Sequence, residues 1–363
     1  MKILFIGPLP EPVTGQSLAC KLFYDALIAA GHEVRLVNLT RRSLRSGIAT
    51  RRIGPVIRLI WDVLRAKKGC NLVYFNVSQS VAGNIKDLLI YAILGPKISS
   101  SFIHLHGGCG AANLLSNAHP LLKWINVWFL RRLAGVIVLG PRQVPIFESM
   151  VVPERIHVVH NFAPDDVFIS DEKLQLKLSE SGPIRVLFLS NLLQGKGHQE
   201  LVAAIKLLDP AVRTRFEFDF AGGFDSLHAK QSFMASIAGL EGVHYHGTVQ
   251  GPMKVALLQN AHVFCLPTYY PFEGQPISIL EGYAAGCAVL TTDHGGIFDV
   301  FVPELNGWAV EKQSPESIAS ALCALVLDPA ALERFARVNT ARARAIYKPV
   351  HHLEQMFNRL GLA

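Results

Sequence analysis

Short apolar runs alternate with helical patterns along the whole chain, and this alternation restricts the possible fold more than any other feature. Residues 2–7 have the pattern of a buried strand, a loop rich in proline and glycine follows, and residues 18–30 have helical periodicity. Residues 33–38 have the pattern of the next strand. A strand, a helix and a second strand in this order build a parallel sheet, so the sequence predicts an α/β fold. Further strands of this first half are predicted at 71–76, 101–106, 135–139 and 158–162.

A second alternation of strands and helices begins at residues 184–189. Its other strands are predicted near 216–221, 243–246, 262–266 and 288–291. The polar stretch from Ala163 to Gly182 is predicted to be a linker between two similar α/β halves. Ligands of open α/β sheets bind beyond the carboxyl ends of the strands, so binding residues are expected in the loops found there. These loops are 8–17, 104–110, 190–197, 222–226 and 268–278, and their convergence would create a cleft between the halves.

The net charge is concentrated in the first half of the chain. Of the formal charge of +7, residues 1–160 carry +12 and residues 161–363 carry −5, which favours an anionic partner for the first half. The six cysteines lack the spacing of a metal site and lie mostly in apolar surroundings, which indicates reduced thiols in a reducing compartment. We expect no signal peptide, because Met1-Lys2 leads directly into a short strand and a loop rich in proline and glycine. We expect no membrane-spanning helix either, because no uncharged apolar run reaches about 18 residues.

Residues 272–286 contain two carboxylates eight positions apart, with a loop and the start of a helix between them. Glu273 falls on the loop, and the residues after Pro276 open a helix whose free N–H groups attract a phosphate. Glu281 falls about one to two turns into that helix and can reach the same ligand. This arrangement fits a diphosphate sugar. The alternative is an ordinary loop–helix junction with two carboxylates in solvent.

Glycine-rich loops follow several of the predicted strands. Residues 190–197 place Lys196 between two glycines, where it can approach a phosphate closely; a surface lysine on a turn is the alternative. Gly295-Gly296 allows the backbone to come close to a ligand, or merely allows a turn. Asn306-Gly307 is typical of a β-turn.

Two further motifs stand at strand ends in the first half. Residues 14–17 (Thr-Gly-Gln-Ser) can place a helix N-terminus at an anion, or can simply cap the helix through Thr14 or Ser17. His104 and His106 lie at the end of a strand, and strand alternation places both on the same side of it. Only the histidine at the mouth of the loop is expected to reach a ligand. A structural role is the alternative for such a histidine.

Basic and aromatic residues interleave in two segments of the first half. Residues 41–68 contain nine Lys or Arg and a single acid, and the part after Pro55 has helical spacing with a basic face. Residues 123–132 form a second patch of this kind. Such segments can lie on an anionic membrane surface, and the alternative is a solvated basic face over core residues. Nucleic acid is not an expected partner, because the sequence contains no recognised nucleic-acid module.

Together and in this order, the motifs resemble those of glycosyltransferase family 4, the retaining group with the GT-B fold of two Rossmann-like domains facing each other across a cleft. The resemblance covers nearly the whole chain and includes Thr14-Gly15-Gln16, His106, Val159-His160-Asn161, the loop 190–197, Glu273 with Glu281, and Gly295-Gly296. It implies an acceptor-binding domain at 1–165 and a nucleotide-sugar-binding domain at 183–345. The C-terminal helix, 346–363, would cross back to the first domain.

The resemblance also implies roles for individual residues. Glu273 would hold the transferred sugar, Lys196 would neutralise the diphosphate leaving group, and His106 would contact the sugar. Donor-binding roles fall to Gly15, Gln16, Asn191, Pro276, Ile277, Ser278 and Glu281, with Glu281 on the ribose hydroxyls. The family usually has an arginine where this chain has Asn191, so one of the two usual phosphate cations is missing.

The resemblance implies a retaining transfer from a nucleotide-diphosphate sugar to a glycan or lipid-linked acceptor, in bacterial cell-surface polysaccharide or lipopolysaccharide synthesis. No metal or other cofactor is expected, because helix N-termini and Lys196 can stabilise the diphosphate and the chain has no Asp-x-Asp motif. The expected location is cytoplasmic and peripheral on the membrane. One alternative is a non-catalytic GT-B partner subunit, which Asn191 favours. A sugar-nucleotide epimerase is another, but its acid–base carboxylates are missing from the ligand loops of the first half except Glu11.

Overall fold

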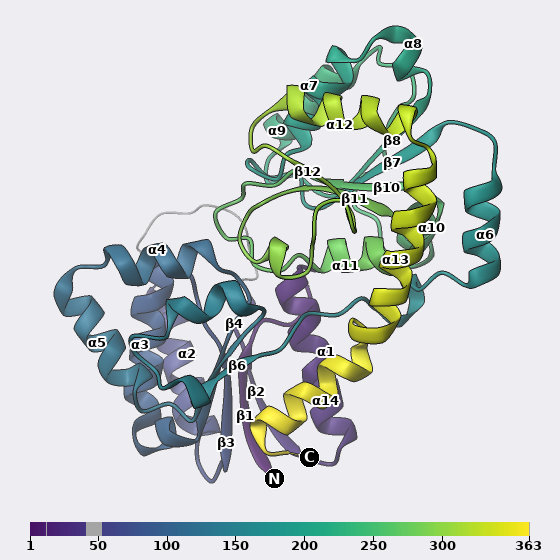
Figure 1. Ribbon diagram of the computed structural model, residues 1–363. Helices are drawn as coiled ribbons and strands as arrows, with labels where there is room; N and C mark the ends of the chain where they lie inside the picture. Colours follow the sequence, from purple (N-terminus) through teal and green to yellow (C-terminus); the bar gives the residue numbers. More distant parts are fainter. Residues whose placement is uncertain (12, 41–52, 363) are drawn as a thin grey trace. The chain divides into compact units, whose positions relative to one another are not determined.

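The computed structural model describes residues 1–11, 13–40 and 53–362, and the chain divides into two compact units (Figure 1). Unit 1 comprises Met1–His160 and His352–Ala363, and unit 2 comprises Asn161–His351. Each unit contains a six-stranded sheet, and all the strand pairs of both sheets are parallel. The strands and helices alternate along the chain in both units, as the sequence predicts.

The sheet of unit 1 has the strand order β2-β1-β3-β4-β5-β6. Its strands are β1 (Lys2–Gly7), β2 (Glu33–Asn38), β3 (Leu72–Asn76), β4 (Ser101–Leu105), β5 (Gly135–Val138) and β6 (Ile156–Val158). The helices are α1 (Gly15–Ala29), α2 (Ile53–Ala66), α3 (Val81–Leu94), α4 (Cys109–Asn117) and α5 (Pro120–Leu130), with most of α14 (Pro349–Leu360).

Successive residues of β1 face opposite sides of the sheet, as strand geometry requires. Ile3 and Phe5 belong to an apolar cluster with α1 and with Met356 of α14. Leu4 and Ile6 belong to a separate cluster with α2, α3 and α5. The C-terminal helix therefore completes one face of the core of unit 1.

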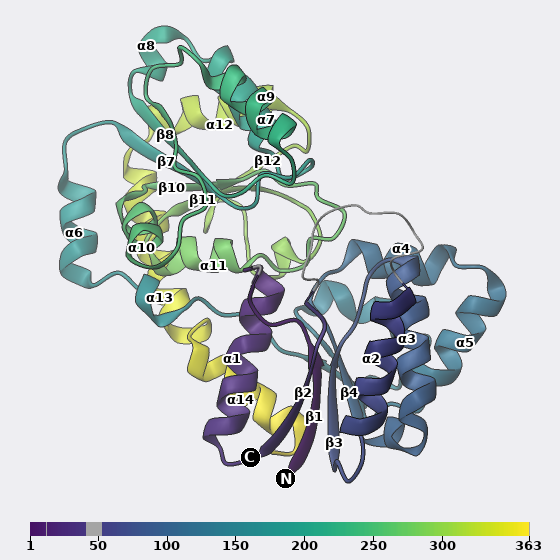
Figure 2. The ribbon, with the colours of Figure 1, turned by 180° about the vertical axis from the view of Figure 1, so that it is seen from behind.

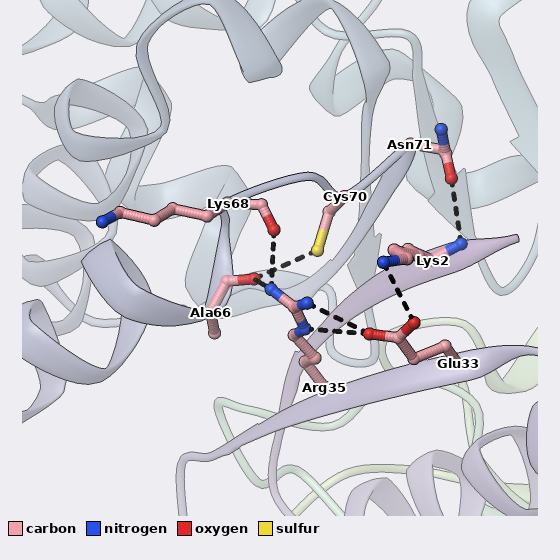
Figure 3. Close-up of polar contacts among 7 residues, drawn as sticks. All are labelled: Lys2, Glu33, Arg35, Ala66, Lys68, Cys70 and Asn71. Atoms are coloured by element: carbon pink, nitrogen blue, oxygen red, sulfur yellow. Dashed lines mark hydrogen bonds and ion pairs between the residues drawn. The ribbon is translucent and has the colours of Figure 1, made fainter.

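Arg35 of β2 ties the end of α2 to the sheet (Figure 3). Its Nη1 donates to the carbonyl oxygen of Lys68 at 2.6 Å, and its guanidinium pairs with Glu33 at 3.0 Å. Glu33 also pairs with Lys2 at 3.4 Å. A cation at the last carbonyls stabilises the end of a helix. Lys2 and Arg35, two of the cations of the basic half, therefore have structural partners.

The sheet of unit 2 has the strand order β12-β11-β10-β7-β8-β9. Its strands are β7 (Ile184–Leu189), β8 (Phe216–Ala221), β9 (Val243–Tyr245), β10 (Val263–Leu266), β11 (Ala288–Thr292) and β12 (Gly307–Val310). Its helices are α6 (Asp171–Ser179), α7 (His198–Leu207), α8 (Pro210–Arg213), α9 (Leu227–Ile237), α10 (Gly251–Asn260), α11 (Ile277–Ala284), α12 (Pro315–Leu327) and α13 (Ala330–Ile346). Every residue of β10 and β11 is buried, as is typical of central strands in a parallel sheet that is covered on both faces.

The segment predicted to be a linker, residues 163–182, contains helix α6 of unit 2. Ser170 caps this helix by accepting a hydrogen bond from the N–H of Lys173 at 3.3 Å. Leu174 is buried and packs with Ile169 and other apolar residues of unit 2. The linker prediction was wrong here because a few apolar anchors fix a segment whose composition is mostly polar.

A strand prediction and a turn prediction also differ from the structure. The strand predicted at 158–162 lies at Ile156–Val158, and the chain then leaves the sheet as the N–H of Asn161 donates to Gln275 at 2.7 Å. Gly307 begins β12 instead of completing a β-turn. Its φ is 145°, and a Cβ there would lie 1.9 Å from the carbonyl oxygen of Val289. Glycine is therefore needed for a close approach between strands, a contact that the sequence did not reveal.

Candidate active site

The loops that follow β7 and β10 lie against each other in unit 2. The N–H of Tyr269 donates to the carbonyl oxygen of Gly195 at 2.7 Å. Gly197 has a φ of 92°, and a Cβ there would lie 2.4 Å from the carbonyl oxygen of Pro267. A side chain at position 197 would therefore push the loops apart. The glycine permits this loop contact, which in turn positions Lys196.

Lys196 and Glu273 meet where these loops touch. Lys196 Nζ lies 2.7 Å from Glu273 Oε2, although the two residues are 77 positions apart. Thr268 donates its hydroxyl to the same oxygen at 3.0 Å, and the Tyr270 ring centroid lies 4.8 Å from the ammonium. The side chains of Lys196 and Glu273 are only 13% and 9% exposed. An ammonium has three donors and a carboxylate has two acceptor oxygens. The ammonium can therefore still donate to an anion, and the carboxylate can still accept from a hydroxyl.

Helix α11 begins directly beyond Glu273. Pro276 is its N-cap residue and no side chain caps the helix. The N–H groups of its first turn, those of Ile277 and Ser278, are positions at which helices bind anions. The structure thus places Lys196 beside Glu273, three residues before the N-cap of α11. The sequence predicts the carboxylate and the helix start for residues 272–286 and predicts Lys196 separately, without their contact.

The Gly295-Gly296 turn packs against the loop that carries Glu273. The N–H of Gly296 donates to the carbonyl oxygen of Gly274 at 2.9 Å. A Cβ at Gly295 would lie 2.7 Å from the carbonyl oxygen of Glu273, and its φ is 55°. The close approach that these glycines allow is to the neighbouring loop. They act on the candidate site by supporting Glu273.

Glu281 is buried on α11 and forms an ion pair with Lys254 of α10. The side chain of Glu281 is 3% exposed and that of Lys254 is 24% exposed. Lys254 bonds to Oε1 of the carboxylate. Sequence reasoning missed Lys254, because one lysine near the start of a helix gives no indication of a partner 27 positions later.

Asn191 is exposed at the start of the loop that carries Lys196. Its carbonyl oxygen accepts from the N–H of Leu193 at 2.9 Å, and the N–H of Leu192 donates to Gly223 at 2.8 Å. The second of these bonds joins the loops after β7 and β8. The Asn191 side chain is an uncharged amide, so it offers hydrogen bonds in place of a positive charge.

The start of α1 in unit 1 is a reciprocal cap. The N–H of Ser17 donates to Thr14 Oγ1 at 3.1 Å, and the N–H of Thr14 donates to Ser17 Oγ at 2.8 Å. The capping alternative is therefore correct for these two residues. Gly15 is exposed beside them, and Gln16 donates its amide to Asn76 Oδ1 at the end of β3.

The rings of His104 and His106, at the end of β4, are in contact, with centroids 3.9 Å apart and planes tilted by 33°. His104 Nδ1 lies 2.7 Å from the hydroxyl oxygen of Tyr74, which is a structural hydrogen bond. Both ring nitrogens of His106 are buried without a hydrogen-bond partner. Burial, with a smaller effect of His352, lowers the pKa of His106 to about 3. The ring is therefore neutral at neutral pH and able to donate and accept.

The predicted site residues form one group in each unit. Asn191, Lys196 and the residues from Glu273 to Glu281 lie in unit 2, whereas Gly15, Gln16 and His106 lie in unit 1. Within the described ranges, no group of three or more His, Cys, Asp or Glu side chains is placed to hold a metal ion. In the same part of the chain, no helix is both long enough and apolar enough to cross a membrane.

Unit 2 matches a known protein family. The family is described as glycosyl transferases group 1, and the match covers residues 170–342. The amylovoran biosynthesis glycosyltransferase AmsK of Erwinia amylovora is 28% identical over 166 residues, which is 44% of this chain and 39% of the relative. A glycosyltransferase of Methanocaldococcus jannaschii is 24% identical over 340 residues, which is 85% of this chain and 84% of the relative.

Another relative is named for a lipid-linked sugar. The N,N'-diacetylbacillosaminyl-diphospho-undecaprenol alpha-1,3-N-acetylgalactosaminyltransferase of Campylobacter jejuni is 30% identical over 41% of this chain and 38% of the relative. The matches to this enzyme and to AmsK thus span about two fifths of the relatives' lengths.

Solved structures resemble the chain over its full length. The Anabaena protein Alr3699/HepE in complex with UDP has a TM-score of 0.73 at 16% identity and covers 100% of both chains. WaaG, a glycosyltransferase involved in lipopolysaccharide biosynthesis, has a TM-score of 0.71 at 14% identity and covers 99% of this chain and 100% of its own. At these identities the likeness concerns the fold, and it confirms the prediction of two Rossmann-like domains.

Proposed function

We propose that the chain, which has the GT-B fold, is a glycosyltransferase of family 4 that transfers a sugar from a nucleotide-diphosphate sugar with retention of configuration. The observation that carries this proposal is the Lys196–Glu273 pair at the start of α11. A diphosphate needs a cation and N–H donors, and a sugar hydroxyl needs a charged acceptor. The three groups lie together in unit 2 in that combination.

In the proposed reaction the bond between the sugar carbon C1 and the diphosphate oxygen breaks, and negative charge grows on the diphosphate. Lys196 and the first-turn N–H groups of α11 stabilise that charge, and such preorganised donors are usually the largest single contribution to catalysis. Glu273 accepts hydrogen bonds from hydroxyls of the transferred sugar. These groups supply the stabilisation from the protein itself, so the proposed mechanism uses no metal.

Glu281 and Asn191 would supply the remaining donor contacts in unit 2. Glu281 would accept from the ribose hydroxyls, with Lys254 holding its carboxylate in place through Oε1. Asn191 supplies an amide where similar enzymes have a phosphate-binding arginine. We therefore expect the diphosphate to depend more heavily on Lys196 in this chain. In unit 1, Gly15 would let the backbone approach the phosphate and the acceptor, Gln16 would contribute to donor binding, and His106 would contact the sugar.

A non-catalytic partner subunit is the second candidate, and Asn191 is the feature that favours it. Incubating the protein with UDP, GDP, ADP and CMP and with their sugar conjugates separates the two candidates. We expect one base series to raise the melting temperature and its sugar conjugate to be hydrolysed slowly without acceptor. Binding without any release of the nucleoside diphosphate, with or without acceptor, would favour the non-catalytic subunit.

We propose a glycan or lipid-linked acceptor in bacterial cell-surface polysaccharide or lipopolysaccharide synthesis. The names of two relatives support this setting, one for amylovoran biosynthesis and one for an undecaprenol-linked substrate. A lipid-linked acceptor requires the enzyme to reach a membrane surface. We therefore place the protein in the cytoplasm, peripheral on the membrane.

The surface proposed for membrane contact lies on three neighbouring helices of unit 1, α2, α3 and α5, which cover the same face of its sheet (Figure 2). These helices expose eight large apolar side chains between 42% and 63%. We name this set the apolar face, and it consists of Ile57, Trp61, Val81, Ile85, Leu89, Leu121, Trp124 and Trp128. Sequence analysis missed the contribution of α3, because that helix carries few basic residues.

Cations border the apolar face. The Arg132 guanidinium lies 3.7 Å from the Trp128 ring centroid, and that of Arg65 lies 4.9 Å from the Trp61 ring centroid. Apolar and aromatic side chains flanked by Lys and Arg are typical of segments that lie on anionic lipid. Residues 41–52 of the predicted basic segment lie outside the described residues, so the proposal depends on α2, α3 and α5.

Replacing Lys123 and Arg131 by glutamine is expected to weaken binding to phosphatidylglycerol vesicles about tenfold or more, because each cation near the surface contributes about 1 kcal/mol. The loss should shrink at high salt. Trp124→Ser should weaken binding at every salt concentration, because it removes apolar contact. Vesicle co-sedimentation measures both effects, with Leu227→Ser on α9 of unit 2 as the matched control. Unchanged binding of all the unit 1 variants would show an ordinary solvated surface.

A further inference from the structure

Buried polar atoms without partners gather at one end of the sheet of unit 1. In the described part of the chain, seven buried side-chain nitrogen or oxygen atoms have no hydrogen-bond partner. Five of them belong to this end of the sheet, namely Asn76 Nδ2, Gln79 Oε1, His104 Nε2 and both ring nitrogens of His106. Asn76 and His104 face each other across the β3–β4 ladder. Buried polar groups of native proteins are nearly always satisfied, so such a cluster indicates a ligand with matching groups.

The loop that carries Gln79 is held firmly. The N–H of Val77 donates to the carbonyl oxygen of His104 at 3.1 Å. The N–H of Ser78 donates to the buried carboxylate of Asp87 at 2.7 Å, and Ser80 caps α3. Gln79 therefore extends from a short segment that is fixed on both sides, as a preorganised binding residue requires.

The Gln79 side chain lies directly over Gly107, the residue after His106. A Cβ at position 107 would lie 1.8 Å from Gln79 Nε2, so glycine makes the room for this amide. On the other side, Gln16 donates to Asn76 Oδ1, and the unpartnered atom of Asn76 is the donor Nδ2. Residues from α1, β3 and β4 thus supply parts of the same cluster.

The unpartnered groups are complementary to alcohol groups in their hydrogen bonding. Burial lowers the pKa of His106 to about 3 and that of His104 well below its usual value, so both rings are neutral at neutral pH. Neutral amides and imidazoles offer donors and acceptors without formal charge. A hydroxyl group also donates and accepts, whereas a phosphate or carboxylate only accepts. The cluster is therefore complementary to hydroxyl groups.

We propose that Gln79 and Asn76, beside His106, which the proposed function already assigns to the sugar, form a site in unit 1 that recognises the hydroxyl groups of a sugar ring. Gln79 Oε1 accepts from one hydroxyl, Asn76 Nδ2 donates to an oxygen, and the His106 ring bonds to a third position. Gln79 is the residue that determines which sugar fits, because a change in hydroxyl orientation leaves its oxygen unpaired. The identification of the ligand as a sugar rests on the proposed function. The ring belongs either to the donor or to the acceptor glycan.

Two variants of Gln79 test this site. Gln79→Ala removes the side chain, and Gln79→Met keeps its length but removes both polar atoms. Asn113→Ala, an exposed amide on α4, is the matched control. The first probes are methyl glycosides of glucose, galactose and N-acetylglucosamine, whose binding is measured by saturation-transfer NMR. The second probes are UDP- and GDP-sugars, whose binding is compared with that of UDP and GDP alone. We expect both Gln79 variants to bind at least one sugar probe about tenfold more weakly, a change of about 1.4 kcal/mol. Binding of UDP or GDP alone should not change.

The outcomes separate the source of the sugar. A loss seen with the methyl glycosides assigns the site to the acceptor, and a loss confined to the nucleotide sugars assigns it to the transferred sugar. Equal binding of every probe by the wild type and both Gln79 variants would overturn the proposal, as would no binding of any sugar probe. Glycoside binding that depends on Gln79, in a protein that neither binds nor hydrolyses any nucleotide sugar, would contradict the proposed function and support the hydroxyl site.

Discussion

Lys196→Ala is expected to lower kcat for sugar transfer by about 10²-fold or more, the scale for losing one preorganised donor at a developing charge. In this chain the effect should lie at the upper end, because Asn191 supplies no second cation. The side chain of Lys196 is only 13% exposed, so water does not readily replace its charge. Steady-state kinetics with the donor identified by binding measures the effect.

Lys206→Ala is the matched control for this prediction. Lys206 is exposed in the last turn of α7, the helix that follows the loop carrying Lys196. We expect its replacement to leave kcat unchanged. The melting temperature of both variants should be compared, because Lys196 also pairs with Glu273. Turnover of Lys196→Ala at the wild-type rate would contradict the assignment of Lys196 to the diphosphate.

Glu273→Gln is expected to lower kcat/KM for the donor by roughly tenfold to hundredfold. A hydrogen bond to a charged group is worth about 1.5–3 kcal/mol, and the amide keeps the shape of the side chain while it removes the charge. The loss should be large with a nucleotide sugar and small for binding of the nucleoside diphosphate alone, because Glu273 is assigned to the sugar. Kinetics and calorimetry on the same preparation give both quantities.

The pairing of Glu273 with Lys196 adds a second test. Groups in direct contact have non-additive effects, so the double variant should lose less activity than the product of the two single losses. Glu241→Gln, at an exposed position of unit 2, serves as the control. Equal losses of the nucleoside diphosphate and the nucleotide sugar in Glu273→Gln would place this carboxylate away from the sugar.

Much of the fold follows from sequence because the strands are short apolar runs between helices. Residues 2–7, 33–38, 184–189 and 216–221 are strands at the predicted bounds. The errors have a common cause in tertiary contacts. Helix α6 depends on buried Leu174, and β12 depends on glycine at position 307 for its approach to Val289. Neither contact has a local pattern.

The candidate site, like the fold, could be predicted from the sequence only in part. Glu273 and Lys196 could be predicted separately from a carboxylate pair and a glycine loop, but their contact over 77 positions could not. Lys254 and Gln79 were missed, because each is a single polar residue whose meaning depends on Glu281 or Gly107. The spacing of residues along the chain indicates which of them share a loop or a helix face. Which loops of different strands come into contact depends on the packing of the whole sheet, so spacing alone does not predict it.

The central claim is that unit 2 binds a nucleotide-diphosphate sugar at Lys196 and α11. The most direct test is the change in melting temperature of the wild-type protein and of Lys196→Ala on addition of UDP, GDP, ADP or CMP, because a ligand that binds only the folded state raises that temperature. We expect a rise with one nucleoside diphosphate in the wild type and a much smaller rise in Lys196→Ala. No rise with any of them, or equal rises in the two proteins, would contradict it.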